Sequence, residues 1–367
     1  MNTRTERMFE RLSNDDMIKA LDELASYVGV KEDPSAQDLV DLLRKGDTQG
    51  CVQQIARRLG LPIRVNLSVV QRDYRRGDPG GFRSNDLVNT SWSGRGTDSI
   101  AAQVSMPPHI PMFGTSSLQD FTIQVRVSSD AKDHPDTFVA VMAHELSHVL
   151  LASLRHPHKQ SELHTDLVPI VLGFRGVVRA GRKTVTRTPT WGGEITRTTT
   201  YGYLTDSQFD CACAYVEAMV HRHAQTKSRL IALVGIGRGR LEAAARSLAT
   251  FREYFSRLES RPPARMKREH AERMVQLYGG DRAREWERVI AKVKRSADDA
   301  DAFARRLNHY TPRAVDQLGT YMRTLEVARE ELEKVIEAIG EDEQMLRGYV
   351  GLAYGIRKFI RSKLVRW

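Results

Sequence analysis

The residues with the clearest chemical potential occupy positions 144–148, which read His-Glu-Leu-Ser-His. In a helix, His144 and His148 lie four residues apart on the same face, so their imidazole nitrogens can converge on one metal ion. Glu145 is rotated by about 100° from His144 at about 3.6 residues per turn, so it can lie beside the metal without binding it. Two neutral nitrogen ligands and an adjacent carboxylate are what zinc-dependent hydrolysis requires.

The surroundings of this motif favour a buried metal site over a pair of surface histidines. No Gly or Pro interrupts the segment, and Pro135 suits the first turn of a helix while Pro157 would end one. We therefore predict a helix from about Pro135 to about Arg155. Its apolar positions include Phe138, Val141, Met142, Leu146, Val149 and Leu150.

A second acidic pattern follows at short range. Glu162 and Asp166 are four residues apart in a segment that predicts another helix, opening at Ser161 and stopping near Gly173. The two carboxylates therefore share one helix face.

The HExxH motif on one helix, followed by Glu-x-x-x-Asp on the next, resembles the gluzincin metallopeptidases. The resemblance covers roughly residues 135–174. It implies that Glu162 is the third zinc ligand beside His144 and His148, and that Asp166 hydrogen-bonds to His144. It also implies a zinc-dependent endopeptidase that hydrolyses peptide bonds through a metal-bound water activated by Glu145. A carboxylate on the far imidazole nitrogen would fix the tautomer and raise the basicity of the ligand.

Other residues remain open as the third ligand or as further contributors. Asp166 itself is one alternative to Glu162, and the nearby histidines are others: His156, His158 and His164. The metzincin pattern is excluded, because Leu151 and Leu154 stand where its Gly and third His belong. A hydrolase of this kind needs a donor for the developing oxyanion. Tyr201 or Tyr203 could provide one, but the sequence assigns neither of them this role.

The elements around the motif predict an α+β fold. Alternating apolar and polar residues indicate strands at Ile63–Val70 and Phe121–Ser128, with a further candidate at Ile100–Met106. Strands that lead into an HExxH helix match a zincin-like catalytic core, in which a small mixed sheet packs on that helix. Val177–Thr200 indicates a β-hairpin around Trp191, and Thr205 with Gln208 forms a capping box for a helix that reaches about Ala224.

Three regions are expected along the chain. Residues 1–60 form a helical N-terminal segment, residues 61–224 form the catalytic core, and residues 225–367 form a basic helical bundle or arm. In the last region, helices are predicted at about 230–258, 263–277, 283–307 and 312–339.

The net charge of +10 is placed unevenly, because residues 225–367 hold 30 Lys or Arg against 20 Asp or Glu. A basic helical region can contact an acidic protein or a nucleic acid. The alternative function is therefore a degenerate or latent zincin scaffold that binds a protein or nucleic-acid partner through its C-terminal helices. Solvated helix faces are favoured over nucleic-acid binding, since no recognisable binding motif occurs there.

The composition argues against a membrane-spanning, secreted or disulfide-linked protein. No apolar run approaches the ~20 residues of a membrane-spanning helix, and the N-terminal residues lack the apolar core of a secretory signal. Cys51, Cys211 and Cys213 are odd in number, and the last two are too close for an unstrained disulfide. We therefore predict a cytoplasmic protein with no membrane partner. Its expected partners are zinc and a protein or peptide substrate.

Overall fold

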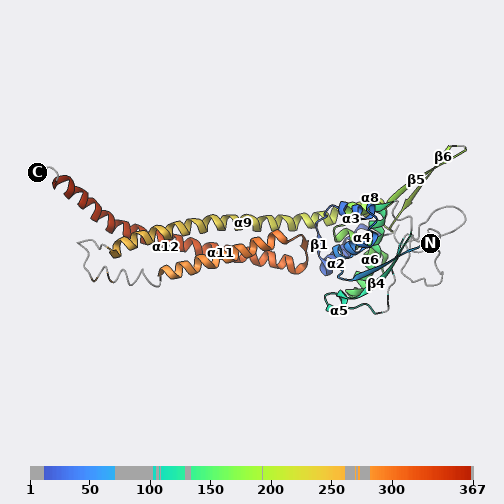
Figure 1. Ribbon diagram of the computed structural model, residues 1–367, viewed down its shortest axis with the longest axis horizontal. Coiled ribbons are helices and arrows are strands. Elements are labelled where there is room, and N and C mark those ends of the chain that lie inside the picture. The colour runs from blue at the N-terminus through green and yellow to red at the C-terminus, as the bar shows by residue number, and fades with distance from the viewer. Residues whose placement is uncertain are drawn as a thin grey trace. The chain divides into compact units, whose positions relative to one another are not determined.

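The chain is mostly helical with three small sheets among its described residues, so its fold is α+β as predicted (Figure 1). The computed structural model describes residues 12–70, 102–104, 107, 109–128, 134–191, 193–260, 269, 272 and 282–364. Two compact units divide the chain: Met1–Arg222 with Asn308–Pro312, and His223–Leu307 with Arg313–Trp367. The first unit holds both the N-terminal helices and the HExxH segment.

Three helices open the first unit. They are α2 (Asn14–Val28), α3 (Gln37–Arg44) and α4 (Thr48–Arg58). Between α2 and α3, strand β1 (Val30–Lys31) pairs antiparallel with β7 (His309–Tyr310), which returns from far along the chain. Gly29 makes this pairing possible: its φ is 70°, and a Cβ there would lie 2.5 Å from the Thr311 Cα.

A three-stranded mixed sheet has the order β2-β4-β3. Strand β2 (Arg64–Val70) runs parallel to β4 (Thr122–Ser128), and β3 (Ala102–Val104) runs antiparallel to β4 on its other side. The buried residues of the sheet alternate with more exposed ones, as the strand patterns predicted; they are Val65, Val104, Ile123, Val125 and Val127. The short helix α5 (Ser116–Gln119) precedes β4. Of the third predicted strand, only β3 falls within the described residues.

The HExxH segment lies on α6 (Pro135–Ser153), which is enclosed by the rest of the first unit. Every residue from Thr137 to Leu151 is buried, and the helix contacts α3, α4, α7, α8 and β3. A helix that is apolar on nearly all sides is typical of such a central position. The few polar side chains on α6 therefore lie in the interior, where they require partners.

The elements after α6 are α7 (Glu162–Val171), α8 (Arg175–Gly181) and the hairpin of β5 (Lys183–Thr190) with β6 (Gly193–Thr200). The predicted hairpin began too early, at Val177. Residues 177–181 are helical instead, because α8 packs against α6 and buries Val177 and Arg175. Tertiary packing therefore overrides the strand-like composition of this stretch.

The capping box predicted at the start of α9 (Asp206–Ser260) is confirmed. The Gln208 backbone N–H donates to Thr205 Oγ1 at 3.3 Å, and the Thr205 N–H donates to Gln208 Oε1 at 2.9 Å. The predicted end near Ala224 is wrong, because the helix runs on without interruption to Ser260. No Pro or Gly stands near position 224 to stop it.

The second unit is built from the later part of α9 with α11 (Ala283–Arg306) and α12 (Pro312–Leu364), drawn side by side in Figure 1. All three contribute to its apolar core, which includes Leu248, Phe251, Trp286, Val335 and Ile339. Helix α12 extends well past the predicted end at Ile339, and the helix predicted at 263–277 lies outside the described residues. Within the described chain, no helix has the length and apolarity needed to cross a bilayer.

Candidate metal centre

Helices α6 and α7 bring together three side chains that could hold a metal ion: His144, His148 and Glu162. Glu162 Oε2 lies 3.5 Å from His144 Nε2 and 3.8 Å from His148 Nε2. The two imidazole rings are nearly perpendicular, with centroids 5.2 Å apart. Three candidate ligand atoms therefore converge on one small volume: the two histidines that helical spacing placed on one face, and the glutamate that the resemblance implied.

The donor set fits a divalent metal. Around tetrahedral zinc, ligand atoms at about 2.0–2.2 Å from the ion stand about 3.3–3.6 Å apart, which is close to the distances from Glu162 to the two histidines. His144 Nε2, His148 Nε2 and both Glu162 oxygens are buried with no hydrogen-bond partner among the described residues. Buried polar atoms without partners are costly, so their convergence indicates a ligand site for a cation.

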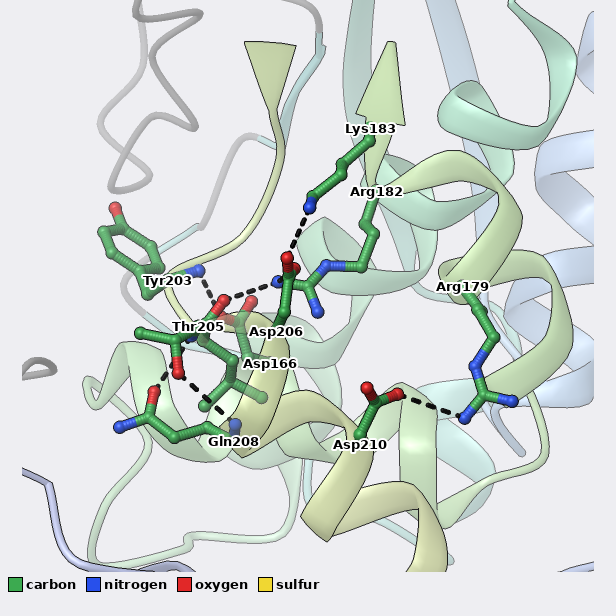
Figure 2. A network of polar contacts seen from close by, with 10 residues as sticks. Asp166, Arg179, Arg182, Lys183, Tyr203, Thr205, Asp206, Gln208 and Asp210 are labelled. Carbon is green, nitrogen blue, oxygen red and sulfur yellow. Dashed lines mark hydrogen bonds and ion pairs between the residues drawn. The ribbon is translucent and has the colours of Figure 1, made fainter. Parts of the chain in front are cut away.

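Asp166 lies behind His144 and orients it. Asp166 Oδ1 is 2.7 Å from His144 Nδ1, and its Oδ2 accepts a 2.6 Å hydrogen bond from the Tyr203 backbone N–H (Figure 2). Gly202 permits this approach: its φ is 85°, and a Cβ there would stand only 3.3 Å from the carboxylate oxygens. Asp166 is thus held from two sides, and the proton on His144 Nδ1 leaves Nε2 free to bind a cation.

His148 has a weaker partner, Thr165 of α7. The Thr165 hydroxyl donates to the Ser161 carbonyl at 3.0 Å, and its oxygen lies 3.3 Å from His148 Nδ1. Because the hydroxyl proton is already used, the oxygen can accept a hydrogen bond from His148 Nδ1–H. Both histidines therefore present Nε2 toward Glu162.

The electrostatics of the pair are asymmetric. Burial opposes a charge on His144, but the hydrogen bond to Asp166 and the nearby carboxylate of Glu162 outweigh it and raise the pKa of His144 to about 10. Burial and then the neighbouring charge of His144 lower the pKa of His148 to about 4. The neighbouring carboxylates therefore favour a proton on His144 Nε2. A divalent cation would take the place of that proton.

Glu145 lies next to His144 on α6 and is fully buried. Its charge contributes to raising the pKa of His144, which places it within electrostatic reach of the candidate ligands. The arrangement thus combines a cation site with an additional carboxylate that is not one of the three converging ligands.

A set of ion pairs fixes the segment that supports Asp166 (Figure 2). Arg182 Nη2 donates to the Leu204 carbonyl at 2.6 Å and lies 3.5 Å from Asp206, which also pairs with Lys183. These contacts join the start of β5 to the segment that follows β6. They hold the Tyr203 N–H in position against Asp166.

The alternative ligands are not part of this cluster. Asp166 is engaged with His144 and the Tyr203 N–H, whereas His156, His158 and His164 gather around Glu23 of α2. Tyr203, one of the two tyrosines that could provide an oxyanion donor, contributes its backbone N–H to the site. Its ring centroid lies 6.5 Å from that of His144.

Several contributors were not predicted from the sequence. Thr165 stands between two predicted site residues on α7, and this position could have indicated a role at the site. A threonine in a helix is common without such a role, however. Gly202 and Arg182 act through contacts with Asp166 and Leu204, over separations of 36 and 22 residues. Sequence periodicity indicates which residues share a face of one helix or strand, so it cannot predict contacts between distant segments.

Comparison of the chain with protein-family models, with curated proteins and with solved structures gave no match. The function must therefore be argued from the site itself.

Proposed function

We propose that the chain is a zinc-dependent endopeptidase of the gluzincin type. The observation that carries the proposal is the convergence of His144, His148 and Glu162, with buried Glu145 beside them and Asp166 behind His144. Two imidazoles and one carboxylate are a ligand set that favours zinc and leaves a fourth position open.

Each residue has a separate task in the proposed reaction. His144 and His148 would bind zinc through Nε2, and Glu162 through its carboxylate. Zinc bound there would supply a Lewis acid that lowers the pKa of a coordinated water. Glu145 takes the proton of the attacking water and passes it to the leaving amine. Asp166 keeps His144 in the tautomer that binds, while the Tyr203 N–H keeps Asp166 in place.

A peptide is the substrate that the surroundings of the site favour. Strand β3 is an edge of the described three-stranded sheet and contacts α6. An extended peptide can pair with such an edge through its backbone, which would position one of its amide bonds near the helix that carries Glu145.

The decisive experiment replaces the base without removing a ligand. Zinc-loaded full-length chain and its Glu145→Gln variant are compared for cleavage of an unfolded protein and of a peptide library, with zinc content measured in parallel. We expect the variant to retain zinc and to lose about 10²–10⁴-fold in activity, the range for removal of a general base.

Ser147→Ala is the matched control, because Ser147 is a buried polar residue of the same helix that hydrogen-bonds only to the Ala143 carbonyl in the described contacts. It should keep both zinc and cleavage. Full activity in the Glu145→Gln variant would eliminate the proposed mechanism. Failure of the zinc-loaded parent to cleave any peptide would instead favour a scaffold that binds partners through its C-terminal helices.

A further inference from the structure

Helix α7 carries a second group of candidate ligands on its opposite side. His164 stands between Glu162 and Asp166 in the sequence but is rotated by about 200° from Glu162 around the helix axis. It lies with His158, from the connection between α6 and α7, and with Glu23 of α2; the three offer ligand atoms that all lie within 4.8 Å of one another. This group shares no residue with the site proposed above.

The distances in this group resemble those of the first one. Glu23 Oε2 lies 3.6 Å from His164 Nε2 and 3.8 Å from His158 Nε2. Ligand atoms around tetrahedral zinc stand about 3.3–3.6 Å apart, so shifts of a few tenths of an ångström would bring Glu23 Oε2 to these distances from both histidines. The rings of His158 and His164 are stacked, with centroids 4.6 Å apart.

His164 is oriented toward the centre of this group. Its Nδ1 lies 3.0 Å from Ser161 Oγ, to which it can donate, so Nε2 keeps its lone pair. The side chain of His164 is only 8% exposed, and its Nε2 has no hydrogen-bond partner within the described chain. A buried acceptor nitrogen directed at a carboxylate oxygen is itself left without a partner unless a cation lies between the two atoms.

His156 supports the carboxylate of Glu23 and is not one of the three ligands. Its Nδ1 accepts a 3.1 Å hydrogen bond from the His158 backbone N–H, so a neutral His156 carries its proton on Nε2. His156 Nε2 lies 3.4 Å from Glu23 Oε1, whereas His158 and His164 lie closest to the other oxygen, Oε2. The edge of the Tyr27 ring packs against His156 and helps to fix it.

We propose that Glu23, His158 and His164 form a second binding site for a divalent transition cation of the zinc class. The cation joins α2 to the α6–α7 connection and to α7, and so fixes the helix that carries Glu162 and Asp166. The only carboxylate among the three ligands binds the metal itself, so this site holds structure together and does not supply a base. Because the side chain of His158 is 54% exposed, the cation can reach the site from solvent.

Zinc stoichiometry tests this proposal on the full-length chain. Metal-free protein is titrated with zinc alone, passed over a desalting column and analysed for bound metal by mass spectrometry. We expect two zinc ions per parent chain. We expect one in His158→Ala and one in Glu23→Gln, where the amide keeps the shape of the carboxylate and still accepts from His156. One is also expected in Glu162→Ala, and none when His158→Ala and Glu162→Ala are combined.

Two controls separate a built site from surface histidines or misfolding. His109→Ala removes an exposed loop histidine and should leave two zinc ions bound. His158→Ala changes an exposed residue, so its circular dichroism and elution volume should match those of the parent. In Glu162→Ala, zinc should raise the melting temperature, and adding His158→Ala should abolish that rise.

A parent chain whose single zinc ion is lost in Glu162→Ala and kept in His158→Ala, or a folded His158→Ala variant that still binds two, would overturn the second site. The outcome is independent of peptidase activity, because a chain that cleaves nothing could still bind two metal ions.

Discussion

The two sides of α7 present the same types of ligand in different settings. On one side, two histidines of α6 meet Glu162; on the other, His158 and His164 meet Glu23. The first group is buried throughout, whereas the second has one ligand open to solvent. In both proposals two imidazoles and a carboxylate bind the cation, whereas the proposed hydrolysis requires further groups around them.

The additional parts are present on the first side only, among the described residues. Glu145 adds a buried carboxylate that is not a ligand, and Asp166 places a negative charge behind His144. On the second side, His164 is backed by the neutral hydroxyl of Ser161. A charged partner makes the imidazole a stronger ligand than a neutral one does, and burial strengthens each electrostatic contact.

The strongest way to break this comparison is to remove Glu162. In Glu162→Ala, we expect the first zinc ion and all measurable peptidase activity to be lost. The fall in activity should be at least as large as the roughly 10²–10⁴-fold loss expected on removal of the general base. The second zinc ion should remain, and metal analysis beside a cleavage assay measures both. Loss of both ions together would show that the two groups do not bind independently.

The charge behind His144 is tested by Asp166→Asn. Asp166 accepts through two different oxygens, and asparagine replaces one of them with an NH2 donor, so either the contact with His144 or that with the Tyr203 N–H is lost. We expect zinc affinity at the first site to fall about 10–100-fold, the usual cost of losing such a partner, with the second site unchanged. Competition with a chelator measures this affinity.

Asp210→Asn is the matched control, since Asp210 makes an exposed ion pair with Arg179 in the same region and touches neither ligand group. Equal losses of affinity in the two variants would indicate a general electrostatic effect and not a specific contact.

The neutral partners provide a finer test, because each backs a different site. Ser161→Ala removes the acceptor of His164 Nδ1, and Thr165→Val removes the oxygen beside His148 Nδ1. Loss of one neutral hydrogen bond costs about 0.5–1.5 kcal/mol, or roughly two- to tenfold in affinity. Zinc titration should show the loss at the second site in the first variant and at the first site in the other. A reversed pattern would contradict the assignment of partners.

The smallest effect concerns the order of metal release. On dialysis of the parent against a chelator, the second site should lose its zinc first, because His158 is exposed and can dissociate without opening the interior. Zinc content followed over time should fall in two phases, with peptidase activity surviving the first. Activity that disappears with the first ion would contradict this order.

Much of the first site could be predicted because its residues are close in sequence. The i, i+4 spacing of His144 with His148, and of Glu162 with Asp166, places each pair on one helix face, and the structure brings these faces together. Strands β2 and β4 could also be predicted, because alternating apolar and polar residues indicate which face of a strand is buried. The predicted boundaries of helices and strands were less accurate. Helix α8 depends on its packing against α6, and α9 continues past Ala224 because no Pro or Gly stops it.

The sequence by itself determined which helix faces carry imidazoles and carboxylates, because helical periodicity acts over a few residues. Only the tertiary structure decided which of those faces meet. It placed Glu23 beside His158 and His164, more than a hundred residues later, and it brought the Tyr203 N–H to Asp166. Such contacts arise when distant segments bury a common core, and no local pattern in the chain encodes their pairing.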